Sequence, residues 1–239
     1  MIAAARMAAV PALRVLVVED SEVGLELTCM MAKRLGIEVD GAADGHQAVQ
    51  LVRAAAACGQ PYGLVLMDFM MPIVDGIEAT RRIRQAGIAA EDLPIVALTA
   101  IAEPRELARF TAAGGQAYLA KPISIEKLDA VLDAWVPDRK AAPPLAHTIA
   151  DPAILGRYAE RKQATIARIA AAIRDGGFDR ATLREIRDLV HKLAGTAGMF
   201  GDDAVSAIAA DCEIELSGLH PGNAREMLQR NLIRLSQTA

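Results

Sequence analysis

Within the first 136 residues, short apolar runs alternate five times with longer segments of helical periodicity. The predicted strands are 13–18, 37–39, 64–67, 95–98 and 116–119, and the predicted helices are 22–35, 46–57, 77–85, 104–112 and 125–135. Strands that are apolar throughout are typical of a parallel sheet that is covered on both faces. We therefore expect a doubly wound, flavodoxin-like α/β domain with five strands over residues 13–136, preceded by an N-terminal extension over residues 1–12.

The pattern changes after residue 136. Residues 137–149 contain three prolines and several charges, which predicts a linker. Beyond it the periodicity is helical only, over 151–175, 180–199, 203–217 and 221–237, and Asp151 with Pro152 predicts the first helix start. Four helices joined by short, glycine-containing turns indicate an up-down four-helix bundle over residues 150–239.

Composition narrows the function classes. Hydrophobic residues make up 53% of the chain, so wholesale disorder is excluded. The net charge of −4 gives no electrostatic reason to expect a nucleic-acid partner. The sequence contains no run of eighteen apolar residues, so we predict no membrane span. Three cysteines without a CxxC pair are typical of reduced thiols. We expect a cytoplasmic protein.

Polar residues follow the predicted strands where those strands end. Glu19 and Asp20 follow the first strand, Asp68 the third, Thr99 the fourth and Lys121 the fifth. The carboxyl ends of parallel strands share one sheet edge, so these side chains should meet there. Three adjacent carboxylates need a cation, and hard oxygen ligands suit Mg²⁺. A metal-bound carboxylate beside a lysine and a hydroxyl is suited to phosphoryl transfer.

Four short motifs stand in this order along the α/β half: Glu19-Asp20, the run LMDFMMPIVDG around Asp68, Thr99-Ala100 and Lys121-Pro122. Together they resemble bacterial response-regulator receiver domains. The resemblance implies that Asp68 is the phosphoacceptor. It also implies that Asp20 binds Mg²⁺ directly, Glu19 through water, and Met70 through its backbone carbonyl.

The same resemblance assigns the remaining polar positions. Thr99 would hydrogen-bond the phosphoryl group, Lys121 would pair with it, and Tyr118 would be the aromatic whose position responds to Thr99. Ser21 departs from the family pattern, because many receivers of hybrid kinases have asparagine there.

His191 differs from the other histidines. It lies beside the apolar stripe of its predicted helix, and Gly195 and Gly198 follow on the same face. Two glycines inside a helix cost roughly 1 kcal/mol each, so a face cleared of side chains suggests space for a partner. A neutral imidazole is a competent nucleophile near neutral pH.

The run HKLAGTAGMFG, which begins at His191, resembles the signature of histidine-containing phosphotransfer (HPt) domains. The resemblance implies a phosphohistidine at His191. The family commonly has lysine three residues after the histidine, where this chain has Ala194. Because Lys192 falls on a different helix face, we expect Arg187 to supply the positive charge.

Together the two halves predict a phosphorelay protein, with an upstream sensor histidine kinase and partner receivers, and without an ATP-binding kinase module. The alternative is a receiver switch with a helical docking or dimerisation domain in which His191 is inert. An aspartyl phosphatase is disfavoured because Met70 stands where such enzymes carry a second aspartate. We also expect the bundle to pack away from the strand ends, with His191 exposed and far from Asp68.

Overall fold

The computed structural model describes residues 14–100, 104–136, 152–217 and 224–238. The first half contains β1 (Arg14–Val18), α1 (Glu22–Arg34), β2 (Glu38–Ala42), α2 (Gly45–Ala57), β3 (Leu64–Asp68), α3 (Gly76–Gln85), β4 (Ile95–Thr99), α4 (Pro104–Ala112), β5 (Ala117–Ala120) and α5 (Ile125–Trp135). All neighbouring strands are parallel, in the order β2-β1-β3-β4-β5. The expected doubly wound, five-stranded sheet is confirmed.

Two apolar cores cover the two faces of this sheet. One core joins the sheet to α2, α3 and α4, where Phe110 is fully enclosed, and the other joins it to α1 and α5 through Met31 and Leu128. The three central strands are buried along their length, as continuous apolar runs require. The central strands are therefore accessible to ligands at their ends.

The sequence misplaced the second strand. We predicted 37–39, but β2 spans Glu38–Ala42. It lies at the edge of the sheet and is only partly buried, so it lacks the apolar run that identifies a central strand. Its polar Asp40 is held by Arg14 and by the hydroxyl of Tyr62. Hydrogen bonds to neighbouring side chains take the place of apolar burial here.

The second half is a bundle of α6 (Pro152–Asp175), α7 (Arg180–Ala197), α8 (Asp203–Ser217) and α9 (Ala224–Ser236) around one apolar core. The four-helix prediction is confirmed, with one difference. We expected the second of these helices to continue to residue 199, but a 3-10 turn, η1 (Gly198–Phe200), follows α7. Gly201 then adopts a positive φ of 77°, which ends the helix at little steric cost.

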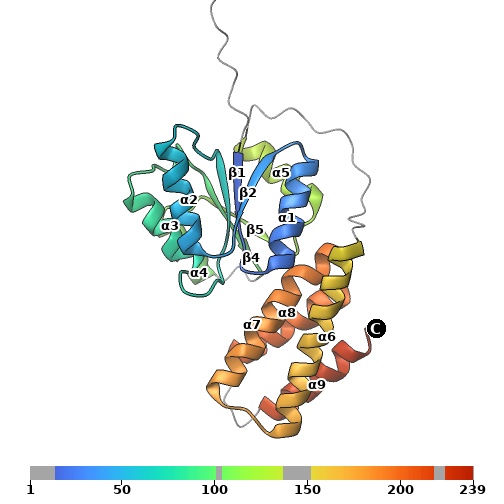
Figure 1. Ribbon diagram of the computed structural model, residues 1–239. Coiled ribbons are helices and arrows are strands. Elements are labelled where there is room, and N and C mark those ends of the chain that lie inside the picture. Colours follow the sequence, from blue (N-terminus) through green and yellow to red (C-terminus); the bar gives the residue numbers. More distant parts are fainter. Residues whose placement is uncertain (1–13, 101–103, 137–151, 218–223, 239) are drawn as a thin grey trace, which may run out of the picture.

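The bundle lies against one end of the sheet, beside α1 (Figure 1). An apolar contact joins the two halves, in which Val23 and Leu27 of α1 meet Ile154 of α6. The predicted N-terminal extension, the linker 137–149 and the Asp151 cap lie outside the described residues. None of the described helices is both long and apolar enough to cross a membrane.

Candidate functional site

The predicted carboxylates meet at the strand ends. Asp68 is the last residue of β3 and is fully buried, while Glu19 and Asp20 directly follow β1, which pairs with β3. One oxygen from each of the three side chains lies within 4.8 Å of the other two. Parallel pairing of β1 and β3 explains this convergence, since it brings both strand ends to one edge.

Lys121 binds two of the three carboxylates. It follows β5, and its Nζ lies 2.6 Å from Asp68 Oδ2 while also forming an ion pair with Glu19. Burial would raise the pKa of Asp68, but the charge of Lys121 and that of His191 outweigh burial and lower it. Burial and the neighbouring Asp68 raise the pKa of Glu19 to about 7, against the opposing effect of Lys121. Asp68 is therefore held as the carboxylate, which is the nucleophilic form.

The residues present fit a divalent cation. Asp20 Oδ1 is buried and accepts no hydrogen bond from any described residue, so a strong acceptor is left available beside two further carboxylates. A buried carboxylate oxygen without a partner is costly unless a cation or water completes it. The Met70 N–H donates to Asp68 Oδ1 over 3.1 Å, which places the Met70 peptide next to the cluster. Oxygen donors of this kind suit Mg²⁺.

The two other predicted residues flank this cluster at different depths. Thr99 ends β4 and is buried, next to the end of β3 in the sheet. Tyr118 lies on the edge strand β5 and is 51% exposed. Thr99 is thus placed at the site itself, whereas Tyr118 lies on the adjacent surface.

His191 is oriented by a residue that sequence reasoning missed. Its Nδ1 hydrogen-bonds Glu213 Oε1 of α8 over 3.0 Å, while its Nε2 is buried and has no partner in the part of the chain that the structure describes. Burial alone would lower the pKa of His191, but the hydrogen bond to Glu213 and the charge of Asp68 raise it. A signal was present, because Glu213 follows the buried Ala209 by four residues on the same helix face.

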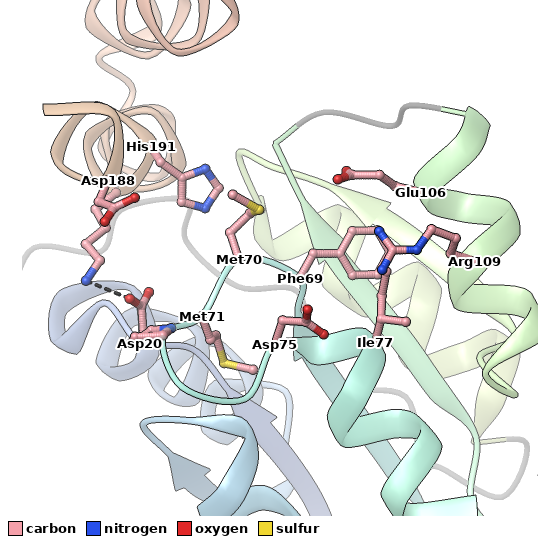
Figure 2. A pocket seen from close by; sticks show the side chains of 12 residues that line it. Asp20, Phe69, Met70, Met71, Asp75, Ile77, Glu106, Arg109, Asp188 and His191 are labelled. Atoms are coloured by element: carbon pink, nitrogen blue, oxygen red, sulfur yellow. Dashed lines mark ion pairs between the residues drawn. The ribbon is translucent and has the colours of Figure 1, made fainter. Parts of the chain in front are cut away.

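His191 faces the strand-end loops of the α/β half, close enough to Asp68 for the two charges to interact. A cavity of about 480 Å³ is lined by Asp20 and Met70 of the α/β half and by His191 and Lys192 of α7. Figure 2 shows His191 projecting from its helix toward Met70 and the loop that follows β3. His191 is 6% exposed. The prediction of an exposed His191 away from the strand ends is therefore wrong.

Gly195 of α7 and Gly198, the first residue of η1, lie at this contact and are called the glycine face of α7 below. A Cβ added at Gly195 would lie 3.2 Å from the Lys121 side chain, and one at Gly198 would lie 2.3 Å from Pro122. We expected these glycines to leave the face free for the receiver of another protein, but in the structure the chain's own α/β half covers it. Two glycines at this surface permit a backbone approach that any side chain would block.

Basic residues of the bundle complete the contact. Lys192 Nζ lies 2.6 Å from Asp20 Oδ2, Arg161 donates to Ser21 Oγ, and Arg157 pairs with Glu26. The expectation that Arg187 supplies the cation is not met, since Lys192 reaches the acidic cluster instead. The long, flexible lysine stem crosses the interface even though its Cα lies off the centre of the face.

Substituting Gly198 tests this contact. Gly198→Ala should slow any transfer between Asp68 and His191 by about tenfold or more, because the new methyl group clashes with Pro122. Gly156→Ala is the matched control, since an added Cβ there meets nothing within 4 Å. Single-turnover transfer rates of both variants provide the measurement. Equal rates in the two variants would contradict the docked arrangement.

The edge of the parallel sheet carries a buried aspartate together with a lysine and two further carboxylates, and the bundle presents a histidine to it. This arrangement is typical of a phosphotransfer protein. Comparison with known proteins identifies the family to which the chain belongs. Residues 15–133 match the response regulator receiver domain, and residues 153–238 match the Hpt domain. The chain belongs to the two-component response regulators and combines a receiver with an HPt domain, the composition of a phosphorelay protein.

Individual relatives agree with this placement. The chain is 45% identical over 122 residues to the two-component response regulator ORR41 of Oryza sativa, with 50% of this chain and 91% of that protein covered. It is 38% identical over 120 residues to the two-component response regulator 24 of Arabidopsis thaliana, covering 50% and 81%. It is 28% identical to the signal transduction histidine-protein kinase BarA of Escherichia coli, covering 94% of this chain but only 26% of that kinase.

Proposed function

We propose that the protein passes a phosphoryl group between Asp68 and His191 within one chain, and from His191 to or from the receiver of another protein. One observation carries this proposal: Nε2 of His191, which has no hydrogen-bond partner among the described residues, lies buried at the face of the chain's own receiver, beside a cavity that both domains line. The alternative of an inert His191 does not account for a buried Glu213 that orients the imidazole.

In the proposed step the phosphoryl group moves from Asp68 to Nε2 of His191. With its Nδ1 proton donated to Glu213, neutral His191 directs the Nε2 lone pair at the phosphorus of an acyl phosphate on Asp68. The Nε2–P bond forms as the Asp68 O–P bond breaks, and the bonding electrons return to the carboxylate. The resulting phosphoimidazolium retains its Nδ1–H, which stays hydrogen-bonded to Glu213, and Lys121 stabilises the freed carboxylate. The reverse step uses the same contacts.

A divalent cation fits the receiver site. Asp20 and Asp68 would bind Mg²⁺ directly, Glu19 through water, and the Met70 carbonyl would complete the protein ligands. When bound, the ion supplies positive charge that offsets the negative charge on the phosphoryl oxygens. Thr99 would donate a hydrogen bond to the phosphoryl group. Tyr118, on the adjacent surface, would change position in response to Thr99.

The partners follow from this chemistry. The phosphoryl group would come from an upstream sensor histidine kinase, since neither of the two matched domains is a kinase domain. A second receiver would dock on the same glycine face of α7, in place of the chain's own receiver. We expect these reactions in the cytoplasm.

Dependence of the transfer rate on protein concentration tests the proposal. Asp68 is labelled with a small phosphodonor such as acetyl phosphate, the donor is removed, and the appearance of phosphohistidine is followed at several chain concentrations. We expect a concentration-independent rate, because both groups belong to one chain. His191→Gln serves as the control. A rate that rises in proportion to concentration would contradict internal transfer, and no phosphohistidine at any concentration would contradict the relay itself.

A further inference from the structure

The acidic cluster draws its counter-ions from both domains. Lys121, a receiver residue, pairs with Asp68 and Glu19. Asp20 instead pairs with Lys192 of α7, at 2.6 Å through its Oδ2 (dashed line in Figure 2). Among the described residues Asp20 forms no other ion pair, so its neutralisation depends on the position of the bundle.

The Asp20–Lys192 ion pair is buried at its Asp20 end and partly buried at its Lys192 end. The side chain of Asp20 is 6% exposed and that of Lys192 is 29% exposed. Arg161 lies close by and donates to Ser21 Oγ, next to Asp20 in the sequence. An ion pair in such a setting is stronger than one at the open surface, and removal of one partner leaves a charge without compensation.

Asp20 is also the carboxylate that would bind Mg²⁺ directly. Its Oδ1 is buried and accepts no hydrogen bond within the described part of the chain, and its Oδ2 is bound to the ammonium of Lys192. A divalent ion on Oδ1 would share one carboxylate with the ammonium on Oδ2, and two positive charges held that close repel each other. The two cations, one from solution and one from α7, therefore compete for one side chain.

We propose that Lys192 is a positioning residue that couples docking of the HPt domain to the cation state of the receiver. Lys192 acts as a removable counter-ion of Asp20, so Mg²⁺ binding displaces it and loosens the bundle from the receiver face. The proposal rests on the proposed function in one respect, the role of Asp20 as a direct metal ligand.

Reciprocity makes the coupling measurable from either side. If the docked Lys192 weakens Mg²⁺ binding by some factor, Mg²⁺ must weaken docking by the same factor. The apolar contact of Val23, Leu27 and Ile154 does not involve the cluster, so it would hold the bundle nearby when Lys192 is displaced. The glycine face of α7 would then open to a second receiver while the domains remain close.

Calorimetric titration of the full chain with Mg²⁺ alone tests the competition. Lys192→Gln should bind Mg²⁺ about five- to tenfold more tightly than the unmodified chain, the size expected from loss of one partly buried ion pair. Lys192→Arg should restore the weaker binding. Arg184→Gln is the matched control, since it removes the same charge from an exposed position of α7 whose side chain donates to the Arg180 carbonyl of its own helix.

The outcomes separate cleanly. Equal Mg²⁺ affinity in the unmodified chain and Lys192→Gln, or equal tightening in Arg184→Gln, would overturn the proposal. Small-angle scattering adds a second readout: Mg²⁺ should increase the radius of gyration of the unmodified chain and leave that of Lys192→Gln unchanged. Compaction by Mg²⁺ would also overturn it. Failure of the proposed function would show differently, as unchanged Mg²⁺ binding in Asp20→Ala or as absence of transfer to His191.

Discussion

Asp68→Asn abolishes labelling of the receiver by a small phosphodonor such as acetyl phosphate, with an expected loss on the order of a thousandfold or more. Asparagine keeps the volume of the fully buried side chain but replaces the nucleophilic carboxylate oxygen with an amide. Because Lys121 holds the pKa of Asp68 below its ordinary value, the unmodified chain presents the carboxylate throughout the neutral pH range. Intact-mass detection of the acid-labile phosphoryl group provides the measurement.

The control for this prediction is Asp75→Asn. Asp75 lines the same cavity and caps α3 by accepting from the Glu78 N–H, a role that an asparagine side chain also performs. Its labelling should match that of the unmodified chain. In Asp68→Asn, phosphohistidine supplied through Asp68 should disappear as well, whereas an external phosphohistidine donor or phosphoramidate should still label His191. Persistent labelling of residues 14–136 in Asp68→Asn would remove Asp68 as the phosphoacceptor.

The fold could be predicted from the sequence because its constraints are local and repetitive. Continuous apolar runs such as β3 and β4 require burial on both faces, and only a parallel sheet with helices on each side provides it. The edge strand β2 shows the limit of that argument. Its partly exposed residues are stabilised by contacts with Arg14 and Tyr62, which no local pattern predicts.

The site was predictable on the receiver side and only partly on the helical side. Strand ends bring Glu19, Asp20 and Asp68 to one edge whatever surrounds them, so residue order was enough. The position of His191 depends on how two domains dock. That arrangement follows from side chains far apart in the sequence, such as Arg157 and Glu26. Helical periodicity reports the neighbours of a residue within its own helix and carries no information on such pairs.

Lys192 shows the same limit at a single residue. Helix geometry places its Cα away from the glycine face, and that placement led us to expect Arg187 as the cation. A lysine side chain spans several ångströms beyond its Cα, however, and its ammonium follows the nearest buried negative charge, here Asp20. The sequence thus identified the residues that carry charge but not which of them meet.

Glu213→Ala should slow phosphoryl transfer to His191 by about ten- to a hundredfold, compared above the His191 pKa that NMR titration gives for each chain so that the imidazole is neutral in both. The truncated side chain no longer accepts the Nδ1 proton, so the tautomer with a free Nε2 loses its support. The phosphoimidazolium that forms also loses its counter-charge. Glu213→Gln should recover part of the rate, since its amide oxygen still accepts from Nδ1.

The pKa of His191 distinguishes an electrostatic role of Glu213 from a merely structural one. Burial lowers the pKa of His191, while Glu213 and Asp68 raise it above the ordinary value. A raised pKa stabilises the fold fully below the unfolded-state value of roughly 6.5, and that stabilisation is lost as pH rises through the folded-state pKa. In Glu213→Gln the charge is gone while burial remains, so the pKa of His191 falls and the neutral nucleophile persists to lower pH. Imidazole titration by NMR measures this shift, with the exposed Glu185→Gln on α7 as the control. An unchanged pKa of His191 in Glu213→Gln, together with an unchanged rate in Glu213→Ala, would show that Glu213 neither charges nor orients the histidine.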